Sequence, residues 1–131
     1  MTCDAGETTV TSLVLYNNSL SGAIPASIGD LVGLEYLNLY FNQITGSLPS
    51  ELGTPTALIE LNIGYNGLTG PIPATLGALS NLEQLDFFDN QLSGTIPVEL
   101  GNLASLTGLE LGGNQLEGSI PIALGNLGNL E

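Results

Sequence analysis

Residues 82–105, LEQLDFFDNQLSGTIPVELGNLAS, are the clearest copy of a pattern that recurs along the chain. The pattern is L-x-x-L-x-L-x-x-N-x-L-x-G-x-I-P-x-x-L-G-x-L-x-x. Its copies begin at Val10, Leu34, Leu58, Leu82 and Leu106, 24 residues apart, and a sixth opens at Leu130. Self-similarity at a fixed period of about 20–29 residues predicts a solenoid, in which each repeat packs against its neighbours.

Four positions hold the same residue in all five copies: one asparagine, one proline and two glycines. The glycines indicate backbone conformations or close approaches that other residues do not allow. The columns are Asn18, Asn42, Asn66, Asn90, Asn114; Gly22, Gly46, Gly70, Gly94, Gly118; Pro25, Pro49, Pro73, Pro97, Pro121; and Gly29, Gly53, Gly77, Gly101, Gly125.

The L-x-G-x-I-P segment resembles the plant-type subclass of leucine-rich repeat (LRR) proteins, found in the ectodomains of LRR receptor-like kinases, in receptor-like proteins and in polygalacturonase inhibitors. The resemblance extends from Cys3 to the C-terminus. It implies an α/β solenoid, a right-handed superhelix of plant-type 24-residue repeats with a parallel β-sheet on its concave face. It also implies a second short strand at the I-P segment and a short helical turn on the convex side.

The predicted domain organisation is a remnant of an N-terminal cap at 1–9, followed by a leucine-rich repeat domain at 10–131. The repeats are 10–33, 34–57, 58–81, 82–105 and 106–129, with the start of a sixth at 130. In the plant-type family the cap carries a cysteine pair, whereas Cys3 has no partner in this chain. We therefore expect a truncated cap and a fragment of a longer protein.

The first residues lack the basic region and apolar core of a signal peptide, and no apolar run approaches the ~18 residues of a membrane span. The resemblance nevertheless implies an extracellular or cell-surface location, with any membrane attachment supplied by a parent protein.

The charge balance is one-sided, with 13 acidic residues and no lysine, arginine or histidine. Nucleic-acid binding depends on basic residues that neutralise phosphates, and so does docking on anionic lipid, so both are excluded. The balance favours a cationic or sugar-like ligand, although acidic residues also serve solubility alone.

Within each repeat the L-x-L alternation predicts a short strand whose leucines point into the core, such as Leu37 and Leu39. Ile44, Leu48 and Leu52 are expected to complete the core of that repeat. The asparagine column must pair its amides to be buried, and the resemblance implies a ladder in which these side chains bond the backbone after each strand. In repeat two Pro55 replaces a leucine, so we expect an irregular convex turn there.

Six of the seven aromatic residues fall at positions expected to be exposed on the concave face, and only Phe87 takes a core position. Exposed, clustered aromatics are typical of recognition surfaces. The alternative is that these rings stabilise adjacent strands by stacking. The predicted ligand-binding residues are Tyr16, Tyr36, Tyr40, Phe41, Tyr65, Phe88, Glu60, Asp86, Asp89 and Glu110.

Catalysis has little support, because Cys3 has no histidine to activate it and no kinase motif is present. Asp86, Asp89 and Glu110 offer oxygen ligands but lack calcium-loop spacing, so neither a metal nor a cofactor is expected. Asn17-Asn18-Ser19 is a glycosylation sequence, which makes Asn17 a candidate glycan carrier.

The sequence thus predicts a non-enzymatic recognition module that binds a peptide, a protein or a glycan. Two alternatives remain: a scaffold repeat protein without a ligand of its own, and an ice-binding protein. The second alternative rests on a regularly spaced Ser/Thr column, which consists of Ser21, Thr45, Thr69 and Ser93 and is broken by Glu117.

Overall fold

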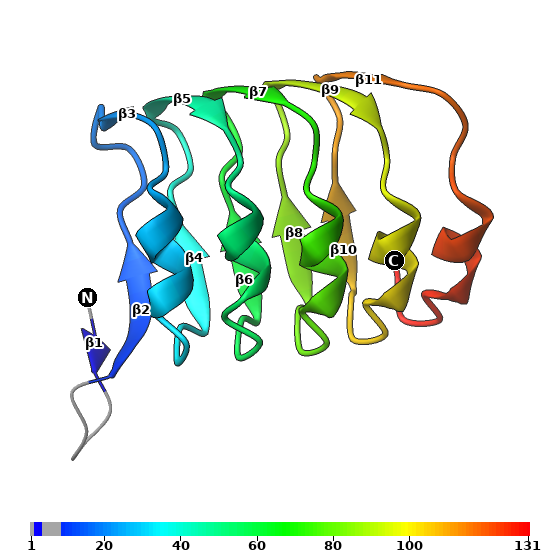
Figure 1. Cartoon of the computed structure of the whole chain (residues 1–131), viewed down its shortest axis with the longest axis horizontal. Coiled ribbons are helices and arrows are strands. Elements are labelled where there is room, and N and C mark those ends of the chain that lie inside the picture. The colour runs from blue at the N-terminus through cyan, green and yellow to red at the C-terminus, as the bar shows by residue number, and fades with distance from the viewer. Residues whose placement is uncertain (1, 4–8) are drawn as a thin grey trace.

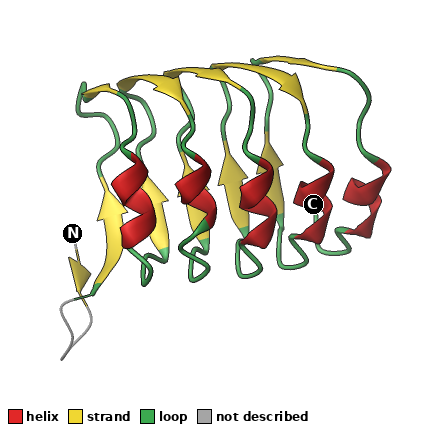
Figure 2. Cartoon of the chain, in the orientation of Figure 1, coloured by secondary structure: helices red, strands yellow, loops and turns green. Residues whose placement is uncertain are grey.

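The computed structural model describes residues 2–3 and 9–131, in which the repeats lie side by side along one axis (Figure 1). Each repeat adds one strand to a long sheet, then one strand to a second sheet and then one short helix, which lies opposite the long sheet (Figure 2). The leucine-rich repeat solenoid expected from the sequence is confirmed. No helix in the described residues is long and apolar enough to cross a bilayer.

The long sheet is parallel across the repeats, and equivalent residues of neighbouring repeats are direct neighbours: Leu37 pairs with Leu61, and Leu61 with Leu85. At its N-terminal edge β1 (Thr2–Cys3) adds to β2 in the antiparallel direction. The predicted cap remnant otherwise lies outside the described residues, as does the side chain of Cys3. The repeat strands are β2 (Val10–Val14), β4 (Tyr36–Asn38), β6 (Glu60–Asn62), β8 (Gln84–Asp86) and β10 (Gly108–Glu110).

The core lies between the long sheet and the helices, and the alternation within each strand decides which side chains enter it. Leu37 is fully buried whereas the next residue, Asn38, is half-buried on the outer face of the long sheet, the face that points away from the core. The predicted core set of repeat two is confirmed, since all of its members are buried: Leu37, Leu39, Ile44, Leu48 and Leu52.

The second sheet runs along the edge where the long-sheet strands end. Its strands precede the I-P step instead of containing it, so the predicted position is wrong by a few residues. Proline cannot donate to a sheet hydrogen bond, and β5 ends before Leu48-Pro49. The strands are β3 (Ser21–Gly22), β5 (Gln43–Ser47), β7 (Gly67–Gly70), β9 (Gln91–Thr95) and β11 (Gln115–Glu117).

Pairing in the second sheet joins residues 22 apart, not 24, so each strand is offset by two residues from its neighbour. Thr69 therefore pairs with Ser47 on one side and with Gln91 on the other. The Ser/Thr column considered for ice binding does not form a row of direct neighbours.

The helical turns of the described repeats are 3-10 helices and not α-helices. Four of them have five residues, whereas η2 has four, as expected from Pro55. Leu79 donates its N–H to Leu76, but Pro55 has no N–H to donate, so Thr54 closes the turn by donating to Glu51 (3.0 Å). The helices are η1 (Ala26–Asp30), η2 (Ser50–Gly53), η3 (Ala74–Ala78), η4 (Val98–Asn102) and η5 (Ile122–Asn126).

Candidate functional site

A sharp turn follows each strand of the long sheet, and the same position of the turn has a positive φ in every repeat. The residues there are Asn17 (φ 56°), Phe41 (54°), Tyr65 (53°), Asp89 (52°) and Gly113 (68°). Glycine, asparagine and aspartate tolerate this left-handed conformation, whereas bulky residues rarely adopt it. Holding phenylalanine and tyrosine there costs of order 1–3 kcal/mol each, a kind of strain that concentrates at functional sites.

Four aromatic side chains meet at these turns and form what we call the aromatic cluster: Tyr40, Phe41, Tyr65 and Phe88. The ring of Tyr65 lies 5.2 Å from that of Tyr40, edge-on, and 5.3 Å from that of Phe88. Phe41 lies 6.2 Å from Tyr65 and 6.3 Å from Tyr40. Three consecutive repeats therefore contribute to one surface of contacting rings.

Glycine in the neighbouring positions leaves room for this arrangement. Gly64 occupies the position of Tyr40 and Phe88 in the repeat between them, and a Cβ there would lie 2.9 Å from the Asp86 carboxylate. The ring of Phe88 lies beside Gly112, where a Cβ would approach it to 3.1 Å.

The two remaining predicted aromatics are exposed, Tyr16 to 57% and Tyr36 to 37%, but they make no ring contact among the described residues. The structure thus brings together four of the six predicted rings. Phe87, in contrast, is fully buried in the core, as expected.

The acidic residues on the outer face of the long sheet have different surroundings. Asp86 accepts a hydrogen bond from the backbone N–H of Phe88 (2.8 Å), as Asn38 does from Tyr40 (3.2 Å). This bond caps the strand end and was not expected from the sequence. Glu60 accepts from the Asn38 amide at 2.9 Å.

Two further predicted carboxylates lie exposed near the cluster. Neither Asp89 nor Glu110 accepts a side-chain hydrogen bond among the described residues. They are therefore the acidic groups most available to a ligand.

The asparagine column forms a ladder of hydrogen bonds beneath the turns. Asn66 accepts from the backbone N–H of Ile44 (2.9 Å) and donates to the carbonyls of Leu39 and Ile63 (both 3.1 Å). Equivalent bonds to two successive repeats are made by Asn42, Asn90 and Asn114. Asn18, in the first repeat, is exposed, and among the described residues its side-chain amide donates only to the carbonyl of Tyr16 in its own turn (3.1 Å).

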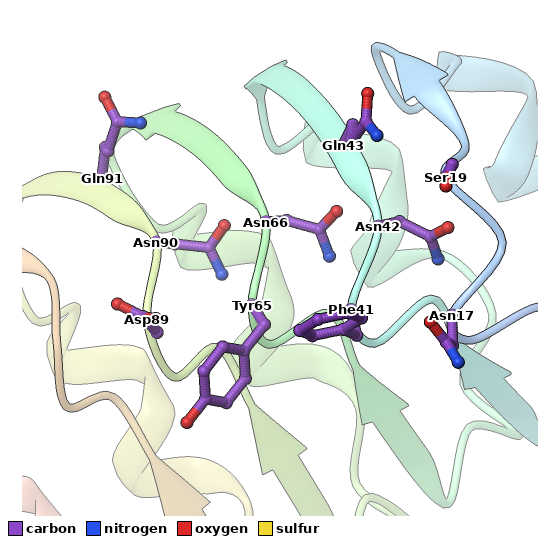
Figure 3. A pocket seen from close by; sticks show the side chains of 10 residues that line it. All are labelled: Asn17, Ser19, Phe41, Asn42, Gln43, Tyr65, Asn66, Asp89, Asn90 and Gln91. Carbon is purple, nitrogen blue, oxygen red and sulfur yellow. The ribbon is translucent and has the colours of Figure 1, made fainter.

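A groove of about 430 Å³, the turn groove, follows these turns across repeats one to four. Figure 3 shows its side chains in three rows, with the ladder asparagines as the floor. One rim consists of the turn residues and the other of residues at the start of the second sheet. The lining residues are Asn17, Phe41, Tyr65 and Asp89; Asn42, Asn66 and Asn90; and Ser19, Gln43 and Gln91.

Three lining residues, Ser19, Gln43 and Gln91, were not predicted as site residues. They occupy the position directly after the ladder asparagine, and Gln43 and Gln91 each precede a buried residue, Ile44 or Leu92. Alternation at that point would have indicated exposed polar side chains, but only the fold places them opposite Phe41 and Tyr65. Among the described residues no group of three or more histidine, cysteine or acidic side chains could hold a metal ion.

Comparison with known proteins identifies the repeats. The leucine rich repeat family models match residues 56–116, and 9–31 with 33–54. No curated protein matches the chain. Folds of this kind, when they form receptor ectodomains, are typically non-catalytic binding modules.

Three solved structures illustrate the similarity. The plant peptide hormone receptor RGFR1 in complex with RGF2 is 45% identical, with a TM-score of 0.89, over 92% of this chain and 19% of that one. The LRR ectodomain of the Arabidopsis receptor kinase HAESA, in complex with an IDA peptide hormone, is 38% identical (TM-score 0.88), over 92% and 20%. A chain of the BIR3–SERK2 complex from Arabidopsis thaliana is 36% identical (TM-score 0.87), over 96% and 68%.

The chain spans about a fifth of the length of the two hormone receptors and about two thirds of the BIR3–SERK2 chain. The agreement in repeat pattern, fold and identity extends over nearly all of its residues. The chain belongs to the plant-type leucine-rich repeat family.

Proposed function

We propose that the chain is a ligand-recognition module that binds a peptide or protein segment on the aromatic cluster. The observation that carries this proposal is the contact of four rings from three successive repeats, two of them exposed (Phe41 and Tyr65) and two half-buried (Tyr40 and Phe88). Aromatic side chains normally enter the core, and contiguous exposed ones are typical of interfaces. Two of the structures similar to this chain are described as complexes with peptide hormones, which supports the same class of ligand.

The charge of the surface favours a cationic segment. Asp86 and Asp89 come from the same repeat as Phe88, and Glu110 lies beside Asp86 in the long sheet. The chain has no basic side chain with which to pair an anionic group. A lysine or arginine of the ligand would gain both carboxylate contacts and the ring faces of Tyr40 and Tyr65.

The family supports the remaining features of the proposed role. The module is non-enzymatic, and receptor ectodomains of this kind support an extracellular or cell-surface location within a longer protein. In that setting Asn17, which is exposed at the end of the turn groove, is the candidate glycan carrier.

The test is selection of ligands from a displayed random dodecapeptide library, followed by titration of the enriched peptides. We expect them to be rich in lysine, arginine and aromatic residues. Tyr40→Ala and Phe88→Ala should each weaken binding about tenfold or more, the loss typical of a central interface anchor. The control is Tyr16→Ala, which removes an exposed tyrosine outside the cluster and should leave the affinity unchanged.

The competing account is that the rings only stack to stabilise neighbouring repeats. It predicts that Tyr40→Ala lowers the stability by about 0.5–1.5 kcal/mol while selected peptides bind as before. Thermal unfolding of the same variants therefore distinguishes the two accounts, and unchanged affinity in both cluster variants would refute the proposed site.

A further inference from the structure

We propose that the turn groove is a second site, which binds a neutral oligosaccharide. It shares Phe41 and Tyr65 with the aromatic cluster but is otherwise lined by different residues. The inference goes beyond the proposed peptide recognition and does not depend on it. The proposal rests on the polar groups of the rims, the paired backbone of the walls and the conformation of the two rings.

The rims carry polar side chains that have no hydrogen-bond partner among the described residues. On the second-sheet rim these are the amides of Gln43 and Gln91, and on the opposite rim the Asp89 carboxylate and the Tyr65 hydroxyl. The floor asparagines, in contrast, use their amide N–H groups on the backbone. Unsatisfied amides that both donate and accept match sugar hydroxyls, which do the same.

Glycine opens the space between the two glutamines. Gly67 occupies the equivalent position in the repeat between Gln43 and Gln91, and a Cβ there would lie 3.9 Å from Nε2 of Gln91. The two amides come from repeats two and four and both line the groove. They therefore suit contacts to an extended chain of rings and not to one small molecule.

The walls of the groove offer no free backbone edge to an extended peptide. Asn42 donates its N–H to Tyr65 (3.2 Å) and Asn66 donates to Asp89 (3.3 Å), while Gln43 donates to Leu20 (2.8 Å). A peptide that binds by strand addition needs unpaired main-chain groups. The groove favours a ligand that is recognised through side chains.

The two rings on the rim of turn residues supply flat apolar faces, against which the C–H face of a sugar ring can pack. Phe41 and Tyr65 hold these faces at a backbone position that suits Asn17, Asp89 and Gly113 better. Their rings lie one repeat apart, 6.2 Å between centroids. The strain accepted at both positions indicates that the rings are kept for a contact outside the chain.

The acidic charge of the chain favours neutral oligosaccharides over anionic ones. The chain has no basic residue to pair a uronate or sulfate group, and Asp89 would repel one. An anionic sugar of the same ring geometry should therefore bind more weakly than its neutral counterpart.

The experiment is isothermal titration of unglycosylated protein with neutral hexasaccharides: the β-1,4-linked glucose, xylose, mannose and N-acetylglucosamine hexamers. The anionic comparison is the β-1,4-linked glucuronate hexamer, the charged counterpart of the glucose hexamer. We expect at least one neutral hexamer to bind with a Kd of about 1 mM or tighter, and the glucuronate hexamer to bind at least about tenfold more weakly. No binding by any neutral hexamer at about 5 mM, or equal binding of the glucuronate hexamer, would overturn the proposal.

Variants locate the site and separate it from the peptide surface. Gln43→Ala combined with Gln91→Ala should weaken sugar binding about tenfold, whereas Gln115→Ala, at the same repeat position but outside the groove, should not. The glutamine variant should leave the affinity for a selected peptide unchanged, because neither glutamine belongs to the aromatic cluster. If the glutamine variant binds sugar normally, or if it loses the peptide while it stays folded in thermal unfolding, the groove is not a separate sugar site.

Discussion

At the residue scale, substitutions at Phe41 can measure the free-energy cost of holding a residue other than glycine in the left-handed turn. Phe41 is 55% exposed, with φ +54°. Phe41→Gly and Phe41→Ala both delete the ring, but alanine must adopt the unfavourable conformation. We expect the glycine variant to be more stable than the alanine variant by about 1 kcal/mol in chemical unfolding, the reverse of the usual order.

Phe88 provides the control for this prediction, because its φ is not positive. There Phe88→Ala should be more stable than Phe88→Gly, by up to about 1 kcal/mol. The same order at both positions would mean that the turn at Phe41 is not strained.

The asparagine ladder gives a second prediction at this scale. Asn66→Leu leaves the N–H of Ile44 without its acceptor and removes three donated bonds, so it should destabilise the chain by about 2–4 kcal/mol despite its added apolar area. Asn18→Leu is the matched control. It removes one exposed bond to Tyr16 and should cost less than about 1 kcal/mol. Equal effects in thermal unfolding would contradict the ladder.

At the scale of the elements, glycine sets the spacing of the 3-10 helices. A Cβ on Gly77 of η3 would lie 2.7 Å from Cβ of Glu99 in η4 and closer still to its carbonyl oxygen. Gly77→Ala should therefore push the two helices apart and destabilise the chain by about 1–3 kcal/mol. Gly125 occupies the same position in the last repeat, where a Cβ meets nothing within 4 Å. Gly125→Ala should be neutral or slightly stabilising, and a comparable loss at both sites would contradict helix contact as the cause.

Sequence patterns predict these elements unequally. The long-sheet strands and their buried leucines follow from alternation and a fixed period, so both could be predicted. The second strand was placed too late, since the I-P step is extended but proline cannot join a ladder. Strands of the second sheet pair residues that are 22 apart. This register depends on the angle between the strands and the axis of the solenoid, which the sequence of a single repeat does not determine.

The site was predictable in part for similar reasons. Single columns indicated exposed rings at Phe41 and Tyr65, but their contacts with Tyr40 and Phe88 arise from adjacent repeats. Gln43 and Gln91 face these rings across the turn, a relation that depends on the angle between the two sheets.

For the whole molecule, packing is complete only where a repeat has two neighbours. Leu61 and Leu85 are fully buried, whereas Leu109, at the same position of the last repeat, is only half-buried. This gradient is expected of a solenoid, whose stability is a sum over repeats and the interfaces between them.

The acidic charge of the whole molecule leads to a salt prediction. With 13 acidic and no basic residues the chain has repulsive charge pairs and no side-chain ion pairs to lose. Raising NaCl from about 0.01 M to about 1 M shortens the screening length from about 30 Å to about 3 Å, so the melting temperature should rise. A triple variant, Glu99→Gln with Glu117→Gln and Glu131→Gln, should show a smaller rise. A melting temperature that falls with NaCl would contradict this account.

The central claim is that the aromatic cluster is where a ligand binds, and aromatic NMR tests it most directly. The chain has only four tyrosines and three phenylalanines, so every ring can be labelled and assigned. On titration with a selected peptide we predict shifts at Tyr40, Phe41, Tyr65 and Phe88, with Tyr16, Tyr36 and the buried Phe87 unchanged. Shifts confined to Tyr16 and Tyr36, or absent from all seven rings while the peptide binds, would place recognition elsewhere on the chain.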